Sequence, residues 1–79
     1  MQADQIKALL AAQLADCEIT VSAQGSHCEV TAVGDVFKGL RALKRQQLVY
    51  AALAEHIASG EIHAVNMKLY DREQWAKGV

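Results

Sequence analysis

The sequence has no proline, only two cysteines, few aromatic residues and no long apolar run. Its longest uninterrupted apolar stretch, residues 48–54, is far shorter than the ~20 residues that a membrane-spanning helix needs. No charged and then apolar leader opens the chain, and together with the low cysteine count this predicts a reducing, cytoplasmic setting and no membrane partner. A net charge of −1 argues against a protein whose whole surface binds polyanions.

The length and the apolar content of the chain suit one small globular domain. The 79 residues are 52% apolar, which is enough for one hydrophobic core. No linker, repeat or low-complexity tract divides the chain, so we predict a single domain over residues 1–79.

The first part of the chain predicts a helix that starts after an N-cap at Asp4 and ends near Asp16. Its residues recur at intervals of three and four and form one stripe: Ile6, Leu9, Leu10, Gln13 and Leu14.

From residue 17 onward the period changes to two, which predicts a β-hairpin. Gly25 and Ser26 suit a two-residue loop with glycine first. With that loop every cross-strand pair on one face is apolar against apolar: Ala23 with Cys28, Val21 with Val30, and Ile19 with Ala32.

We predict a helix over residues 40–59, whose first turns allow a break. Gly60 is expected to end it in a left-handed conformation. The stripe expected to face the core comprises Leu43, Gln47, Tyr50, Ala54 and Ile57, with Leu53 beside it. Residues 62–70 alternate as a third strand, with a core face formed by His63, Val65, Met67 and Leu69. Asp71 and Gln74 form a capping box for a last short helix, whose Trp75 is expected to fold back on the core.

The element order is therefore αββαβα. We predict an α+β fold with a three-stranded mixed sheet and helices on one face, in which a crossover helix joins two parallel strands.

His63 is the most informative candidate for chemistry. An imidazole among apolar neighbours needs a hydrogen-bond partner or a metal. Two readings stay open: a satisfied, half-buried histidine at the sheet edge, or a ligand with one ring nitrogen facing outward.

His27 and Cys28 form a second candidate pair at the hairpin tip. Alternation turns His27 outward, where it is either simply solvated or free to coordinate, and turns Cys28 inward as core filler. The hairpin register keeps Cys17 and Cys28 too far apart for a disulfide, and no cysteine pair has the spacing of a closed zinc site.

Four basic residues fall within eight positions without an intervening acid: Lys38, Arg41, Lys44 and Arg45. They form either a solvated basic face or a site for phosphate or carboxylate groups. Phe37 and Tyr50 are assigned to the core rather than to a stacking platform. No nucleophile elbow, phosphate-binding glycine loop or catalytic triad is recognisable, so we expect no enzymatic activity.

Four segments together resemble the BolA family, in particular its short-loop bacterial, IbaG-like branch. They are Val36-Phe37-Lys38-Gly39-Leu40, residues 44–53, Ile62-His63-Ala64 and Glu73-Gln74-Trp75. The family fold is similar to a type II K-homology domain.

The resemblance implies a partner, a monothiol glutaredoxin, that shares a [2Fe–2S] cluster with this chain in iron–sulfur trafficking or in iron or stress sensing. The glutaredoxin would supply its cysteine and a bound glutathione, and this chain would supply His63 and a second ligand. We expect His27, rather than Cys28, to be that second ligand. The loop of Phe37, Lys38 and Gly39, with the basic residues Arg41, Lys44 and Arg45, would form part of the docking surface.

The hairpin is shorter than in many family members, and His27 and His63 are expected on opposite faces of their strands. Lys44-Arg45-Gln46 replaces an Arg-His-Arg, and Arg72 follows the cap Asp71 where proline is usual. Two other functions stay open. One is a DNA- or RNA-binding transcriptional regulator that uses the basic surface, although the chain lacks a Gly-x-x-Gly loop. The other is a metal-free interaction module. The isolated chain is expected to be a monomer.

Overall fold

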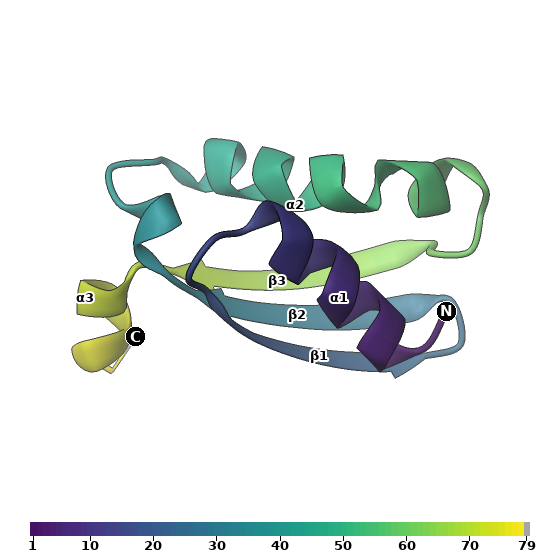
Figure 1. Ribbon diagram of the computed structural model, residues 1–79, viewed down its shortest axis with the longest axis horizontal. Coiled ribbons are helices and arrows are strands. Elements are labelled where there is room, and N and C mark those ends of the chain that lie inside the picture. Colours follow the sequence, from purple (N-terminus) through teal and green to yellow (C-terminus); the bar gives the residue numbers. More distant parts are fainter. Residues whose placement is uncertain (79) are drawn as a thin grey trace.

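The computed structural model describes residues 1–78 and confirms the predicted order αββαβα. The elements are α1 (Ala3–Gln13), β1 (Glu18–Gln24), β2 (His27–Val33), the short 3-10 helix η1 (Asp35–Phe37), α2 (Ala42–Ala58), β3 (Ala64–Tyr70) and α3 (Arg72–Ala76). Helices α1 and α2 lie on the same face of the sheet, and α3 lies at one end of it (Figure 1). No helix within residues 1–78 is long and apolar enough to cross a membrane.

The sheet has the strand order β1-β2-β3, with β1 antiparallel and β3 parallel to β2. The hairpin register is the predicted one, since Ala23 pairs with Cys28 and Val21 with Val30. Gly25 has a φ of 59°, a left-handed conformation that glycine adopts at little cost. Turn chemistry and apolar alternation therefore select the same pairing.

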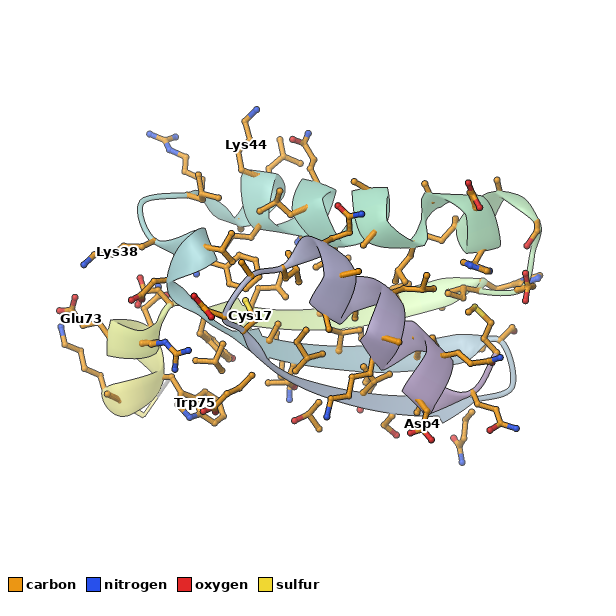
Figure 2. All side chains as sticks on the ribbon, in the orientation of Figure 1. Asp4, Cys17, Lys38, Lys44, Glu73 and Trp75 are labelled. Atoms are coloured by element: carbon orange, nitrogen blue, oxygen red, sulfur yellow. The ribbon has the colours of Figure 1, made fainter. Side chains whose placement is uncertain are left out.

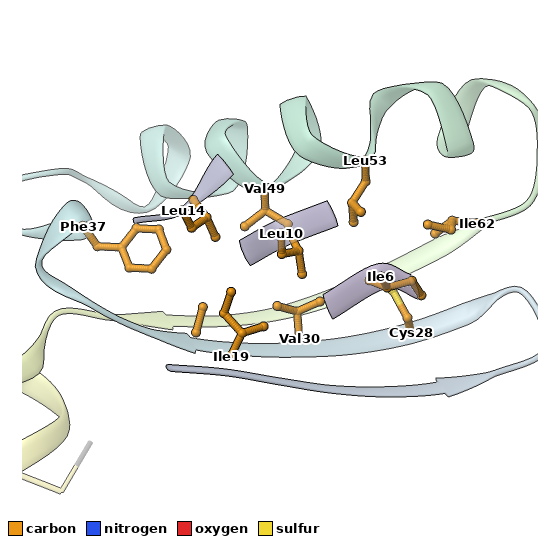
Figure 3. Packing of buried hydrophobic residues seen from close by; sticks show 11 residues of the cluster. Ile6, Leu10, Leu14, Ile19, Cys28, Val30, Phe37, Val49, Leu53 and Ile62 are labelled. Atoms are coloured by element: carbon orange, nitrogen blue, oxygen red, sulfur yellow. The ribbon is translucent and has the colours of Figure 1, made fainter. Parts of the chain in front are cut away.

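The core lies between the sheet and the two long helices (Figure 3). Its buried members come from every element except β3 and α3: Ile6, Leu10, Leu14, Ile19, Cys28, Val30, Ala32, Phe37, Val49, Leu53 and Ile62. From β3, Val65, Met67 and Leu69 pack against it while partly exposed, as the strand alternation predicts.

The predicted N-cap of α1 is wrong. The helix begins at Ala3, and the amide of Gln2 before it donates to the side-chain oxygen of Gln5 at 2.9 Å. Asp4 lies inside the first turn, where its negative charge interacts favourably with the positive N-terminal end of the helix dipole. The helix ends at Gln13, earlier than predicted, although Leu14 remains buried as expected.

The predicted core face of α2 is right only for Leu53, which is buried, and for Ile57, which packs against the core; the rest of the stripe is exposed. Leu43 and Tyr50 are 65% and 43% exposed, whereas Val49 and Leu53 are fully buried. Both helix faces carry apolar residues, and the sheet packs against the face that contains Arg45, Val49 and Leu53.

Helix α3 has the predicted capping box, because the amide of Gln74 donates to Asp71 Oδ1 at 2.7 Å and the amide of Asp71 donates to Gln74 Oε1 at 3.0 Å. Trp75 does not fold back on the core. It is 48% exposed and lies against Tyr70, with 5.7 Å between the ring centroids.

Candidate functional site

His63 lies in the short loop between α2 and β3, one residue before the strand begins. Its ring is exposed, and neither ring nitrogen has a hydrogen-bond partner within residues 1–78. The expectation that His63 belongs to the strand's core face is therefore wrong, because buried Ile62 fills the core at this end instead. An exposed imidazole with an unengaged nitrogen is available as a ligand for a metal brought by a partner.

The backbone around His63 is fixed on both sides. Its amide donates to the carbonyl oxygen of Ser26 at 2.8 Å, which ties the loop to the tip of the β1–β2 hairpin. On the other side, Gly60 has a φ of 84° and ends α2 as predicted. A Cβ atom at Gly60 would lie 3.6 Å from His63 Nε2, so the ring lies close to the end of the helix.

A hydrogen-bonded cluster holds the loop between α2 and His63. His56 Nδ1 and Glu61 Oε1 are 3.0 Å apart, and the Ser59 hydroxyl donates to the same carboxylate at 3.2 Å. These hydrogen bonds from His56 and Ser59 lower the pKa of the Glu61 carboxyl group. Sequence analysis did not single out Glu61, although an acid five residues after a histidine near a helix end was a visible signal.

His27 begins β2, and its Cα pairs with that of Ala64 on β3. Its exposed ring lies on the sheet face opposite the helices, beside a hollow of about 300 Å³. The other polar side chains around this hollow are Ser22, Gln24, Glu29 and Asn66. The structure therefore brings His27 and His63 to the same end of the sheet, with His27 on the face opposite the helices and His63 in the loop beside the end of α2.

Cys28 lies on the helix-covered face and is 3% exposed (Figure 3). Burial raises the pKa of its thiol above 9.0, which disfavours the thiolate that binds iron. Cys17 is partly exposed (Figure 2), and burial raises its thiol pKa as well; both residues are free thiols. Within residues 1–78, no three potential ligands among His, Cys, Asp and Glu come together as a metal site.

Three of the four predicted basic residues, Lys38, Arg41 and Lys44, are exposed around the start of α2, and Figure 2 shows the first and last of them projecting outward. The prediction that Arg45 belongs to this surface is wrong. Arg45 is buried, with 9% of the residue exposed, and its guanidinium donates to the carbonyl oxygens of Leu40 and Leu69 at 2.9 and 3.0 Å.

Arg45 also donates to Gln74 Oε1 at 2.7 Å and lies 3.8 Å from Asp71. It therefore joins α2 to β3 and to the start of α3 from inside the molecule. The prediction that Phe37 contributes a docking side chain is wrong for the same reason, since Phe37 is fully buried and lies 6.0 Å from the Arg45 guanidinium. Gly39 is exposed with a φ of 78°.

The chain is similar to known proteins over nearly its whole length. The model of the BolA-like protein family matches residues 5–74. The acid stress protein IbaG of Escherichia coli (strain K12) is 43% identical, and the match covers 98% of this chain and 92% of that protein.

Solved structures agree with the sequence match. A BolA protein homologue from Coxiella burnetii is 30% identical with a TM-score of 0.83, and the match covers 96% of this chain and 97% of that one. Yeast Fra2 is 29% identical with a TM-score of 0.63, covering 98% and 82%. The chain belongs to the BolA family.

Proposed function

We propose that this chain is a non-enzymatic adaptor or regulator that binds a monothiol glutaredoxin and shares a [2Fe–2S] cluster with it. The cluster would serve iron–sulfur trafficking or the sensing of iron or stress. The observation that carries the proposal is the exposed His63 ring, whose nitrogens have no hydrogen-bond partner within residues 1–78 while its backbone is held by Ser26 at 2.8 Å. The similarity to a protein named for acid stress supports a role in stress.

The residues of this chain fit half of such a site. Histidine in place of cysteine on one iron of a cluster raises its reduction potential, so His63 would tune the cluster as well as hold it. Residues 1–78 contain no complete set of metal ligands. The remaining ligands would therefore come from the glutaredoxin cysteine and its glutathione. A site open to a second protein suits transfer or sensing better than a purely structural role.

His27 is the proposed second ligand because its ring is exposed, whereas Cys28 is buried and its thiol pKa is raised. The His27 imidazole leaves β2 on the sheet face opposite the helices, whereas the His63 imidazole leaves the loop before β3 near the end of α2. Shared ligation therefore requires the hairpin tip around Gly25 to turn His27 toward the helix-covered side. This requirement makes His27 the weaker of the two ligands. Replacing His27 should therefore reduce the amount of bound cluster less than replacing His63 does.

Anaerobic co-expression with a monothiol glutaredoxin tests the proposal. The complex should co-purify with iron and sulfide and show a visible charge-transfer spectrum. His63→Ala should change that spectrum and remove a histidine nitrogen coupling from the electron paramagnetic resonance of the reduced cluster. Lys77→Ala, a change of an exposed residue next to α3 at the other end of the sheet (Figure 1), should leave that coupling in place.

An unchanged spectrum in His63→Ala would remove His63 from the ligand set. If His63→Asn leaves every partner complex intact and no iron is bound, the chain is a metal-free interaction module instead.

A second candidate function is a DNA-binding transcriptional regulator. The favouring observation is that Lys38, Arg41 and Lys44 are exposed and form no salt bridge within the described chain. Without Arg45 the surface offers three phosphate contacts rather than four, so we expect weak binding with a strong salt dependence. A salt titration with duplex DNA tests this function, and no detectable binding at low salt would end it.

A further inference from the structure

Helix α2 forms the outermost layer of the molecule, and nothing covers its outward side within residues 1–78 (Figure 1). A surface helix normally carries polar residues on the side that faces water. Here two large side chains are on that side, because Leu43 and Tyr50 are 65% and 43% exposed. The helix is thus apolar on a second face that the core does not use.

At about 100° per residue, one set of residues points away from buried Val49. Besides the charged Lys44 and Glu55, its members are exposed and uncharged: Leu43, Gln47, Tyr50, Ala51, Ala54 and Ala58. We refer to these residues as the α2 outer face. Four of them, Leu43, Gln47, Tyr50 and Ala54, follow spacings of four, three and four, the pattern of a seam between two packed helices. A central tyrosine is also typical of protein interfaces.

Charged residues border this face on one flank only. Lys44 and Glu55 are eleven positions apart, about three helical turns, so they lie on the same side of the helix. Both are exposed, and neither forms a salt bridge within residues 1–78. Figure 2 shows Lys44 projecting away from the sheet. The α2 outer face therefore has a positive group near its start and a negative group near its end.

We propose that the α2 outer face docks a second copy of this chain, with the two α2 helices antiparallel. A two-fold axis near Tyr50 brings Lys44 of each copy beside Glu55 of the other, so both charges are paired twice in one dimer. In a parallel two-fold arrangement the charged flanks of the two copies lie on opposite sides of the helix pair, so neither charge is paired. Alanine residues 51, 54 and 58 allow the two helix backbones to approach closely.

The expected dimer is weak. A helix of 17 residues is about 25 Å long and about 10 Å across, and such a face is smaller than the ~800 Å² per partner of a standard interface. We therefore expect a dissociation constant on the order of 0.1–1 mM. The chain is then a monomer at micromolar concentrations, and its self-association requires neither a metal nor a glutaredoxin.

The experiment is sedimentation equilibrium of the full chain from about 20 µM to 1 mM at low salt. Lys44→Glu and Glu55→Lys should each weaken dimerisation about tenfold, because each replaces two attractions by two repulsions. The double variant Lys44→Glu/Glu55→Lys should restore it. Leu43→Gln with Tyr50→Gln should abolish it. Lys7→Glu changes an exposed lysine on α1 and serves as the matched control.

All of these side chains are exposed, so the variants should keep the circular dichroism spectrum of the parent chain. A chain that stays monomeric to 1 mM would overturn the proposal. The proposal would also be overturned if the double variant Lys44→Glu/Glu55→Lys dimerised as weakly as the two single variants. If the variants leave self-association unchanged but abolish glutaredoxin binding, the α2 outer face belongs to that partner instead.

Discussion

The backbone amide of His63 donates a hydrogen bond to the carbonyl oxygen of Ser26, with 2.8 Å between nitrogen and oxygen. This bond joins the loop after α2 to the tip of the β1–β2 hairpin. The candidate ligand is thus held by a turn that lies far from it in the sequence, and the conformation of that turn controls where the imidazole sits.

Gly25→Ala should destabilise the hairpin tip by about 1–2 kcal/mol, because the φ of 59° at Gly25 costs an ordinary residue that much. No neighbouring atom would touch the added Cβ, so the effect is purely conformational. Chemical denaturation measures the loss, and amide exchange at His63 should speed up with it. Ser26→Ala is the control, since the acceptor at Ser26 is a backbone oxygen; a loss there as large as at Gly25 would contradict this account.

Arg45→Met should destabilise the fold by about 2–4 kcal/mol, because it leaves the partly buried carbonyl oxygens of Leu40 and Leu69 without their donor and removes the positive charge beside Asp71. The loss should release α3, which the fluorescence of the single tryptophan, Trp75, reports directly. Arg41→Met removes an exposed arginine and should cost less than about 0.5 kcal/mol. Equal effects of the two substitutions would show that Arg45 is not an internal link.

The Glu61 cluster should make stability depend on pH. The pKa of Glu61 is lowered in the folded chain from an ordinary value of 4.5, so its contribution is present above that value. It is lost as the pH falls through the lowered folded pKa. The difference in urea midpoint between the parent chain and Glu61→Gln should therefore shrink from pH 7 to pH 3.

Glu73→Gln is the control for the pH experiment, because it removes a carboxylate 3.1 Å from Lys77 on α3, away from the cluster. A difference between the parent chain and Glu61→Gln that stays constant with pH would show that the hydrogen bonds to His56 and Ser59 do not hold the carboxylate ionised.

Cys28 should react with thiol reagents at least about tenfold more slowly than Cys17 at pH 7.5. Burial raises both thiol pKa values above 9.0, but Cys28 is almost fully buried and Cys17 is only partly so. Mass spectrometry of the labelled chain separates the two sites. Equal rates would mean that Cys28 is accessible and would make it a rival to His27 as the second ligand.

The strand pairing was predictable from sequence because two independent signals agreed. Gly25 and Ser26 set the loop, and the apolar alternation on both sides of it allowed only one register. The capping box of Asp71 and Gln74 was predictable for a similar reason, since the spacing alone determines the two hydrogen bonds.

The orientation of α2 was not predictable, because the helix has two apolar faces and periodicity cannot rank them. Only the packing of α2 against α1 and β3 decides that Val49 faces inward and Tyr50 outward. Arg45 was assigned to the surface by its charge, yet it is buried because backbone oxygens of Leu40 and Leu69, distant from each other in sequence, meet its guanidinium. His63 was expected on the core face of the third strand, but it is exposed in the loop before β3, and its surroundings come from a loop and a hairpin that only the fold brings together.

The most direct test of the central claim is the nitrogen coupling pattern of the reduced [2Fe–2S] complex between this chain and a monothiol glutaredoxin, compared between the parent chain and His63→Ala. Our account predicts that the substitution removes a strongly coupled histidine nitrogen and shifts the visible spectrum. The same coupling in both samples would contradict it.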